Sequence, residues 1–509
     1  MTSSRGSASS AEGVVVASPD GEEKQPIDVK RWGLLLLGVA LFVAMYLAPQ
    51  LGDAVDPNGK SFALSYEGKT AIALFLLAAT WWVTEAVPIG ITAITIGIVQ
   101  AIFINIKDVR TPRDAFTDFM DPSVWFIFGS LIIGLVFTKT GLTRRLAYKM
   151  LAVVGEKTSM IYLGCFVMTS ALTLIMAHTA VAATIFPLLM AIYGLYTDED
   201  KPTKFGKGLF MGMAYVAGAG SIITLLGAAR GAVALGFYRD ITGKEVSFFE
   251  LSYYMAPIGI VMTFVLWAYF MVYYKPEKKT IPGLRERVKV LNSKLGPIKR
   301  DEILALVIVL AAIAILSLRS FIPALAPLNK SAVILTTTVL FFVFNILKLE
   351  DLEQASWNII LLFGGAMSIG FCLWHTGAAE WMAIHWLTLF VEAPWFAFVL
   401  GMAFFVLLMT NFIMNVAAIA ISMPVAFVIA PYMHVDPEVV LFASLVTAGM
   451  PFLLLVGAAP NAIAYASKQF TSKEFFVCGL PASAILMVVL AFFVWLVWPM
   501  MGMPVLTTG

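Results

Sequence analysis

Long uninterrupted runs of apolar residues dominate this chain, and short polar stretches separate them. Typical runs are WGLLLLGVALFVAMYLAP from Trp32, MAPIGIVMTFVLWAYFMVYY from Met255 and ILALVIVLAAIAILSL from Ile303. Each run is long enough to cross the hydrocarbon core of a bilayer as one helix, and the short alternating segments of a membrane β-barrel are not evident. The pattern predicts an all-α polytopic membrane protein with about eleven transmembrane helices.

Two apolar stretches, 158–195 and 396–432, are too long for one crossing and too short for two. Each has small or polar residues at its centre, at Ala177-His178-Thr179 and at Met414-Asn415-Val416 respectively. Two half-crossings joined by a turn fit this length better than a single helix does. The sequence therefore predicts two re-entrant hairpins whose tips lie near the middle of the membrane.

The stretches 206–237 and 438–470 are interrupted in another way, by small residues and proline. The first contains GAARGA from Gly227, and the second contains GAAPNA from Gly457. Glycine and proline weaken a helix and free backbone groups. At membrane depth such groups are tolerated only where protein buries them or where they line a cavity. We expect two broken helices whose half-helix N-termini face an anion in a polar pocket.

These interrupted segments form an internal repeat. LLGAARGAVALGF from Leu225 matches LVGAAPNAIAYAS from Leu455 at an offset of 230 positions, and MAHTAVAATIFP, ending at Pro187, matches IMNVAAIAISMP, ending at Pro424, at an offset of 237. Many transporters consist of two such repeats in inverted orientation, with the substrate site between them. We expect that arrangement here.

The repeat suggests a division of the chain into five parts. They are a disordered cytoplasmic tail (1–28), N-terminal scaffold helices (29–120), a first repeat (121–274), a basic cytoplasmic linker (275–300) and a second repeat (301–509) whose final helix is 477–505.

Composition and charge agree with a membrane protein and give it an orientation. The chain is 60% hydrophobic and 13% charged, and its mean hydropathy is +0.88, outside the range of water-soluble domains. Lys and Arg gather in the linker, in TKTGLTRRLAYK from Thr138 and beside the first run at Lys30. The positive-inside rule places these segments and the N-terminus in the cytoplasm. We expect a protein of the inner (cytoplasmic) membrane with no nucleic-acid partner.

Catalytic motifs are missing from the sequence. Cys165, Cys372 and Cys478 lie in separate apolar segments and predict neither a disulfide framework nor a metal site. There is no HExxH, GxSxG or Walker sequence to supply a metal or a nucleophile. We expect no enzymatic activity and no cofactor, which leaves a transporter or, less favoured by the broken helices, an anion channel.

Three motifs resemble those of the divalent anion:sodium symporter family, also called solute carrier family thirteen. They are WWVTEAVPIGITAI from Trp81, FMDPSVWFIFGSLIIGLVFTKTGLTRRLA from Phe119 and PNAIAYAS from Pro460, and the similarity extends from about Trp81 to the C-terminus. The resemblance implies a homodimer with an elevator mechanism. It also implies transport of small anions, such as dicarboxylates, citrate or sulfate, with sodium.

The same resemblance implies a set of site residues. The family has a Ser-Asn-Thr motif at each hairpin tip and a Thr-Pro-Pro-Asn-like motif at each break, which together hold the anion and two sodium ions. Carried over by position, the substrate-binding residues are His178, Thr179, Arg230, Asn415, Pro460 and Asn461, and the ion-binding residues are Gly227, Asn415, Gly457 and Asn461. Only Thr179, Asn415, Pro460 and Asn461 keep the family residue.

The departures from the family motifs concentrate in the first half. Ala177 and His178 replace a serine and an asparagine, and Arg230 and Gly231 replace proline and asparagine. These changes remove oxygen ligands of the kind that sodium needs and add a fixed cation. The sequence predicts an anion transporter with reduced or altered sodium coupling; proton-coupled transport and exchange are the alternatives.

Two residues have competing interpretations. Arg230 either presents its guanidinium to an anion or has a structural role, snorkelling to an interface or pairing with Glu85, Asp121 or Glu380. His178 either contacts the substrate, takes up a coupling proton, or is a neutral ring that donates one hydrogen bond to a hairpin carbonyl. We expect substrate contact in both cases.

Overall fold

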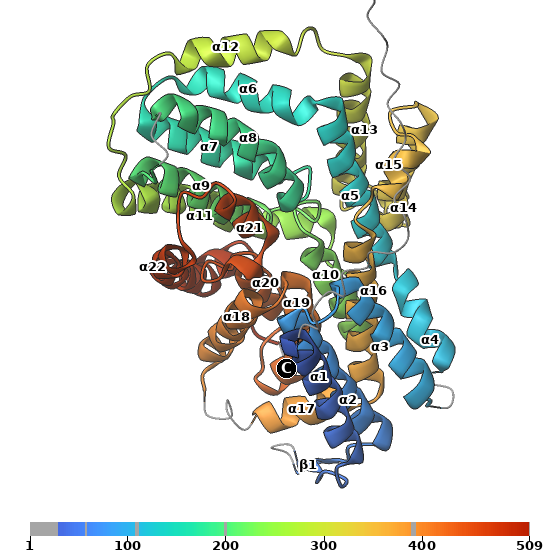
Figure 1. Ribbon diagram of the computed structural model, residues 1–509. Helices are drawn as coiled ribbons and strands as arrows, with labels where there is room; N and C mark the ends of the chain where they lie inside the picture. Colours follow the sequence, from blue (N-terminus) through green and yellow to red (C-terminus); the bar gives the residue numbers. More distant parts are fainter. Residues whose placement is uncertain (1–28, 56–58, 107–110, 198–200, 388–392, 508–509) are drawn as a thin grey trace, which may run out of the picture.

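The computed structural model describes residues 29–55, 59–106, 111–197, 201–387 and 393–507, so the predicted tail 1–28 lies outside the described residues. Helices dominate these ranges. The strands described there form one short antiparallel pair, β1 (Ala54–Val55) and β2 (Ser61–Phe62). The expectation of an all-α fold is therefore met apart from this pair, which lies with α1, α2 and α17 at the lower end of the molecule in Figure 1.

The first half of the chain supplies helices of very different length. They are α1 (Val29–Leu47), α2 (Tyr66–Thr84), α3 (Ile89–Phe103), α4 (Pro112–Thr117), η1 (Asp118–Met120), α5 (Pro122–Thr140), α6 (Leu142–Val154), α7 (Thr158–Leu172), α8 (His178–Tyr196), α9 (Lys204–Gly220), α10 (Ala229–Thr242), α11 (Phe248–Tyr273) and α12 (Leu284–Lys294).

The second half follows a comparable order. It contains α13 (Arg300–Leu318), η2 (Pro323–Leu325), α14 (Lys330–Val343), α15 (Leu349–Glu353), α16 (Trp357–His375), α17 (Ala378–Leu387), α18 (Trp395–Phe412), α19 (Asn415–Tyr432), α20 (Pro437–Ala448), η3 (Leu455–Gly457), α21 (Ala459–Tyr465), α22 (Ser472–Phe492), a π-helical turn η4 (Phe493–Val497) and α23 (Trp498–Met500). The last long helix thus begins at Ser472, ahead of the expected 477.

Local sequence explains where several helices begin and end. Asp121 caps α5 by accepting from the amide of Ser123, and Pro122 suits the first helical position because its missing N–H would have no helical partner. The same helix ends at Gly141, whose φ of 83° lies in the left-handed region that glycine adopts most readily. This glycine lets the chain turn sharply from α5 into α6.

Nine helical stretches among the described residues are long and apolar enough to cross a membrane, and three of them are the hairpin helices α8, α18 and α19. The number falls short of the eleven expected because the broken helices are split into short pieces and α3 and α14 are brief. The total of eleven crossings therefore remains a prediction. A multi-pass helical membrane protein is nonetheless evident.

Burial separates peripheral from central helices. In the candidate spans, 83% of the α19 window is buried within the protein, against 11% for α1. An apolar helix that protein does not cover needs lipid, whereas one that protein surrounds belongs to the core. In Figure 1, α19 lies beside α20. Helix α19 of the second hairpin is therefore interior to the molecule, whereas 44% of the window of its partner α18 is buried.

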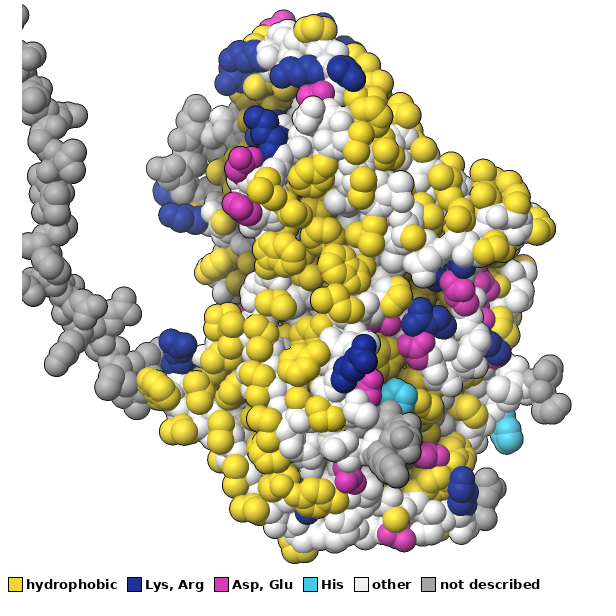
Figure 2. Space-filling model, turned by 90° about the vertical axis from the view of Figure 1, so that its right-hand side faces the viewer, with side chains coloured by type: hydrophobic (Ala, Val, Ile, Leu, Met, Phe, Trp, Pro, Cys, Tyr) yellow, Lys and Arg dark blue, Asp and Glu magenta, His cyan; other side chains and the backbone are white. Residues whose placement is uncertain are grey.

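Basic helices mark one end of the molecule. In Figure 1, α6 and α12 lie side by side along the top. Arg145 of α6 is buried and forms an ion pair with Glu302 of α13, and it also donates to carbonyl groups of the segment 295–297. Figure 2 shows Lys and Arg gathered at this end, above a broad hydrophobic surface. This distribution matches a membrane-embedded body with one basic rim.

Candidate functional site

The two helix breaks lie further upstream than the sequence motifs suggested. Helix α9 ends at Gly220 and α10 already begins at Ala229, while α20 ends at Ala448 and α21 begins at Ala459. The non-helical segments are therefore 221–228 and 449–458, apart from the short turn η3. Arg230 and Pro460 each stand at the second position of the helix that follows. Proline is tolerated there because the helix needs no donor at that point.

Both second halves of the broken helices begin in the same way. Their N-cap residues, Ala228 and Ala458, have extended backbone with φ of −162° and −152°, and neither has a side chain that caps the helix. The first amide groups of an α-helix have no intrahelical acceptor and carry the positive end of its dipole. These helix starts are suited to an anion.

The two broken helices touch where small residues allow close approach. A Cβ atom added to Gly218, near the end of α9, would lie 2.6 Å from the carbonyl oxygen of Gly449 at the end of α20. A Cβ atom on Gly449 would in turn lie 2.7 Å from Nη2 of Arg230. Glycine is required for this contact because any larger side chain would push the chains apart.

Arg230 is buried at this crossing, with 2% of its surface exposed. Its Nη2 donates a 2.8 Å hydrogen bond to Oγ of Ser221. Ser221 is the C-cap of α9 and Gly449 is the C-cap of α20. The guanidinium thus lies at two helix C-termini, whose partial negative charge stabilises a cation.

No carboxylate among the described residues forms an ion pair with Arg230, and its buried Nη1 has no hydrogen-bond partner there. Of the carboxylates considered as partners, Asp121 binds Arg239 instead. The alternative in which Arg230 forms an ion pair with Asp121 is therefore wrong. A buried guanidinium N–H without an acceptor is costly, and an anion would supply the missing acceptor.

The space beside Arg230 is small in this conformation. The cavity there measures about 10 Å³ and is lined by residues of the first break, α10, α11 and α20. That volume holds at most about one water molecule, so a dicarboxylate or sulfate ion does not fit. The conformation described is closed around the guanidinium.

His178 begins α8 and binds the first break. Its backbone amide donates to the carbonyl oxygen of Gly227 at 3.0 Å, and its ring Nδ1 lies 3.2 Å from the same oxygen. Arg230 lies close enough for its charge to act on the ring. The interpretation as a ring that donates to a carbonyl fits these contacts, with the carbonyl supplied by the break rather than the hairpin. Thr179 follows in the first turn of α8 and is half-buried.

The second hairpin and the second break contribute a group of oxygen atoms. Oδ1 of Asn415 accepts from the hydroxyl of Thr410 at 2.9 Å, and the same hydroxyl lies 3.2 Å from the carbonyl oxygen of Ala448. Gly457 is close to this group, since a Cβ atom on it would lie 2.8 Å from the carbonyl oxygen of Thr410. Amide, hydroxyl and carbonyl oxygens are ligands that sodium accepts.

Asn461 has a structural role, and its expected part in binding the anion or sodium stays a prediction. Its Nδ2 donates to the carbonyl oxygens of Pro451 at 2.9 Å and Leu454 at 3.2 Å. The structure therefore uses this amide to hold the non-helical segment 449–458. Pro460, next to it, is buried in the same first turn of α21.

Three further residues of the site were not identified from the sequence. Asn411 accepts from the backbone amides of Leu453 and Leu454, so it holds the same segment from the side of α18. Thr410 and Ser221 bind Asn415 and Arg230 as described. Thr410 and Asn411 could have been found from the sequence, because they form a polar pair that ends a long apolar run. Ser221 had no such signal.

The predicted site residues thus fall into two groups. His178, Gly227 and Arg230 lie together at the first break, and Asn415 and Gly457 lie together at the second. The contact of Arg230 with Gly449 connects them.

Comparisons with known proteins agree with a transporter. The family model described as sodium:sulfate symporter transmembrane region matches residues 29–504. The sodium-dependent dicarboxylate transporter SdcS of Staphylococcus saprophyticus is 26% identical to this chain. The aligned region covers 92% of this chain and 92% of the relative. The protein of that name from Staphylococcus aureus strain bovine RF122 is 24% identical, with 94% of this chain and 93% of the relative covered.

Two solved structures resemble the fold. MtrF of Neisseria gonorrhoeae, described as illuminating a class of antimetabolite efflux pumps, has a TM-score of 0.54 at 11% identity, with 92% of this chain and 94% of that chain covered. The YdaH transporter of Alcanivorax borkumensis has a TM-score of 0.51 at 13% identity, with coverage of 93% and 97%. At these identities the likeness concerns the fold alone.

Proposed function

We propose, from the premise that this chain belongs to the sodium:sulfate symporter family, that it carries a small di- or tricarboxylate, sulfate or related oxyanion across the cytoplasmic membrane and that Arg230 binds the anion directly. Membership of the family makes it a membrane transporter of anions and not an enzyme, with sodium as the family's coupling ion. The observation that carries the rest is the buried guanidinium whose Nη1 has no acceptor in the described part of the chain.

The surroundings of Arg230 support an anion at this place. The uncapped N-terminus of α10 and the hairpin tip at His178 lie beside it. A guanidinium presents several N–H groups in a planar fork that matches a carboxylate or an oxyanion. Because the cavity of about 10 Å³ is too small for such an anion, the segment 449–458 or the first hairpin moves when the anion binds.

The same surroundings support reduced sodium coupling. In the first group, Ser221 accepts from Arg230 and the carbonyl oxygen of Gly227 lies against His178, so these oxygens already have donors. A sodium ion placed beside the guanidinium would be repelled by several kcal/mol even at an effective dielectric of about 20. In the second group the single hydroxyl of Thr410 is the donor to both Asn415 and Ala448, so a rotation of that hydroxyl would free the three oxygens for one sodium ion.

We further propose the inverted repeat, the elevator movement, the homodimer and the cytoplasmic N-terminus that the family resemblance implies. The two breaks support the repeat, because their N-cap residues Ala228 and Ala458 have matching backbone conformations. The basic rim formed by α6 and α12 supports the orientation.

Exchange of anions is the alternative favoured by a specific observation. A guanidinium that stays in the protein neutralises the anion on every crossing, so transport of one anion against another needs no ion. Proton coupling through His178 is less favoured, since Arg230 opposes a second positive charge there.

Uptake into proteoliposomes tests the proposal. Radiolabelled succinate, citrate and sulfate are offered with and without sodium, and the sodium Hill coefficient of the wild-type protein is expected to be one or less. Arg230→Ala is expected to lose most affinity for the transported anion, while Arg287→Ala, at an exposed position of α12, serves as the matched control. Steep dependence on several sodium ions, or normal uptake by Arg230→Ala, would contradict the proposal.

A further inference from the structure

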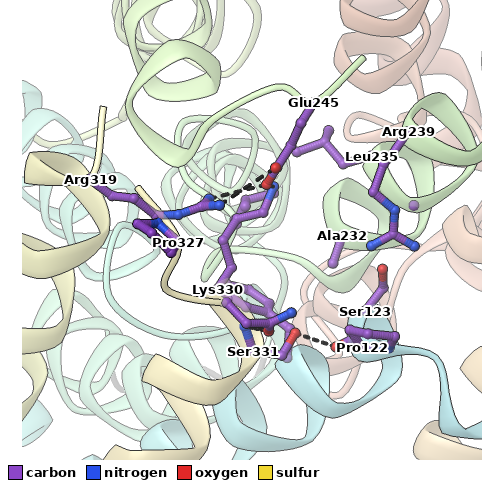
Figure 3. A pocket seen from close by; sticks show the side chains of 14 residues that line it. Pro122, Ser123, Ala232, Leu235, Arg239, Glu245, Arg319, Pro327, Lys330 and Ser331 are labelled. Carbon is purple, nitrogen blue, oxygen red and sulfur yellow. Dashed lines mark hydrogen bonds and ion pairs between the residues drawn. The ribbon is translucent and has the colours of Figure 1, made fainter. Parts of the chain in front are cut away.

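A second and much larger cavity lies about two helical turns further along α10. It measures about 260 Å³ and lies between the start of α5, the outer part of α10 and the start of α14. Figure 3 shows Arg319 and Lys330 reaching Glu245 on one side and Arg239 and Ser123 on the other. This volume accommodates a small multiply charged anion together with a few water molecules.

The walls of this cavity hold more positive than negative charge. The lining residues include three cations and one carboxylate. The cations are Arg239, Arg319 and Lys330, and the carboxylate is Glu245. The carboxylate is bound by Arg319 at 3.1 Å and by Lys330 at 3.0 Å. Asp121 and Asp240 pair with Arg239 but do not line the cavity.

The polar groups are also placed to receive an anion. Pro122 and Ser123 begin α5, and the segment 329–331 begins α14, so two helix N-termini meet at the cavity wall. Glu245 holds two of the cations at fixed positions while no anion is present. An incoming anion competes with Glu245 for them, so binding is weak, as suits a ligand that must move on.

The large cavity adjoins the small one beside Arg230. Leu225 lines both. Its Cδ2 atom would lie 3.1 Å from a Cβ atom placed on Gly231, the residue next to Arg230. The side chain of Leu225 is therefore common to the walls of the charged cavity and of the closed site.

The charged cavity lies at the end of α13 that is remote from the basic rim. Helix α13 begins at Arg300, just after α12, and runs for 19 residues before Arg319, a distance of about 28 Å. If α12 is cytoplasmic, the cavity faces the other side of the membrane.

We propose that this cavity is a second binding site for small multiply charged anions, in which Arg319, Lys330 and Arg239 hold the anion before it passes Leu225 to Arg230. The anion site follows from the cavity alone, while its place on the transport path rests on the proposed function. The site selects the class of ligand by charge, and Arg230 binds it afterwards.

A reporter thiol at Ser123 tests the site without knowledge of the transported anion. Ser123→Cys is reacted with an anionic and a cationic methanethiosulfonate of similar size, and Asn329→Cys on the other wall is a second reporter if the first variant folds poorly. The three native cysteines are buried, so the background is low. We expect the anionic reagent to react with the Ser123→Cys thiol about tenfold faster than the cationic reagent does, because the positive potential of the cavity attracts anions. Ser61→Cys, beside Asp53, should show no such preference.

Charge variants and protection complete the test. Lys330→Gln should lower the preference for the anionic reagent, and Glu245→Gln should raise it, because the first removes a positive charge from the cavity wall and the second a negative one. Protection by an anion distinguishes a binding site from a purely structural ion-pair network. Millimolar sulfate or succinate should slow the reaction, also in an Arg230→Ala background. Equal rates for the two reagents, or the absence of protection, would overturn the second site. Neither of these results depends on uptake by Arg230→Ala. The proposal of a second anion site and the proposal that Arg230 binds the anion can therefore fail independently.

Discussion

At the scale of single residues, the chain shows how a fixed cation is stabilised inside a membrane protein. Arg230 has no carboxylate partner among the described residues and is instead surrounded by helix ends and one serine hydroxyl. The partial negative charges at two helix C-termini supply part of the electrostatic stabilisation that a carboxylate would otherwise give. The N–H groups of Nη1 have no acceptor among the described residues, so they are available to a ligand.

The contact between Gly449 and Arg230 gives the first prediction. In Gly449→Ala the new Cβ would lie 2.7 Å from Nη2 and 2.5 Å from a methyl carbon of Ile222, so the guanidinium and Ile222 must both move. The backbone of Gly449 is helical, with φ of −74°, and tolerates alanine. We expect the concentration for half-maximal anion uptake to rise by about tenfold or more, equivalent to about 1.4 kcal/mol.

Gly194→Ala on the exposed side of α8 is the matched control, because nothing lies within 4 Å of its added Cβ. An unchanged affinity in Gly449→Ala would mean that the position of the guanidinium does not set binding.

Glu245 gives a prediction about pH. Burial opposes its ionisation, yet the hydrogen bond from Arg319 and the charge of Lys330 prevail and lower its pKa from 4.5 to about 2. A carboxylate with a lowered pKa stabilises the fold above its unfolded pKa, and this contribution is lost as pH falls towards the folded pKa. Since Glu245 is 42% exposed, we expect at most about 1 kcal/mol.

The measurement compares the thermal midpoints of the wild-type protein and Glu245→Gln in detergent. Their difference should be constant from pH 8 to about pH 5. It should shrink below about pH 4.5, where the Glu245 carboxyl of the unfolded chain takes up a proton, and should continue to shrink down to the folded pKa of about 2. A difference that grows as pH falls would contradict this interpretation.

At the scale of elements, the second break is held in place by two asparagines from different helices. Asn411 of α18 binds the amides of Leu453 and Leu454, and Asn461 of α21 binds carbonyl oxygens of the same segment. An unwound segment at membrane depth must satisfy its backbone groups within the protein. The segment 449–458 is therefore specified by side chains rather than by a helical hydrogen-bond ladder.

Asn411→Ala should loosen this segment. Two half-buried amides would lose their acceptor, at about 1 kcal/mol each. Hydrogen exchange of peptides covering 449–458 should accelerate, and the thermal midpoint should fall. Ser422→Ala is the control, since that hydroxyl bonds within its own helix α19. Equal exchange in the two variants would show that the segment holds its shape without Asn411.

The sequence predicted elements better than contacts. The hairpin tips and the broken helices follow from apolar length and from small residues, both of which are local signals. Pro460 is expected from the sequence to unwind the helix, yet it lies in the first turn of α21, after the break. The binding of ligands by Pro460 and Asn461 stays a prediction, and the structure adds that the Asn461 amide also binds backbone. Ser221 was not identified although its partner Arg230 is only nine positions away, because a single serine in an apolar segment gives no sign of the direction in which its hydroxyl points. The partners of Asn411 lie 42 and 43 positions away, so the polar pair at Thr410-Asn411 gave its place but not its role.

At the scale of the whole molecule, the basic rim and the charged cavity lie at opposite ends of α13. This arrangement gives a test of orientation with two cysteines. Ser293 is exposed on α12 and Ser320 is exposed just beyond the other end of α13. With a cytoplasmic linker, Ser320→Cys should react with an impermeant thiol reagent in intact cells, whereas Ser293→Cys should react only after the cells are opened. The reverse pattern would invert the orientation, and equal labelling would show that α13 does not cross.

The burial of Arg230 also has an electrical consequence. In the elevator cycle proposed above, a bound sodium ion leaves with its substrate, but the guanidinium of Arg230 stays with the carrier on both legs. With a divalent anion and one sodium ion, the contributions at the site cancel on the loaded leg, while the empty site moves one positive charge. Moving that charge across the full field is worth about 2.3 kcal/mol per 100 mV. A membrane potential that is negative inside therefore holds the empty carrier facing inward, slows net uptake and leaves exchange of one anion for another almost unaffected.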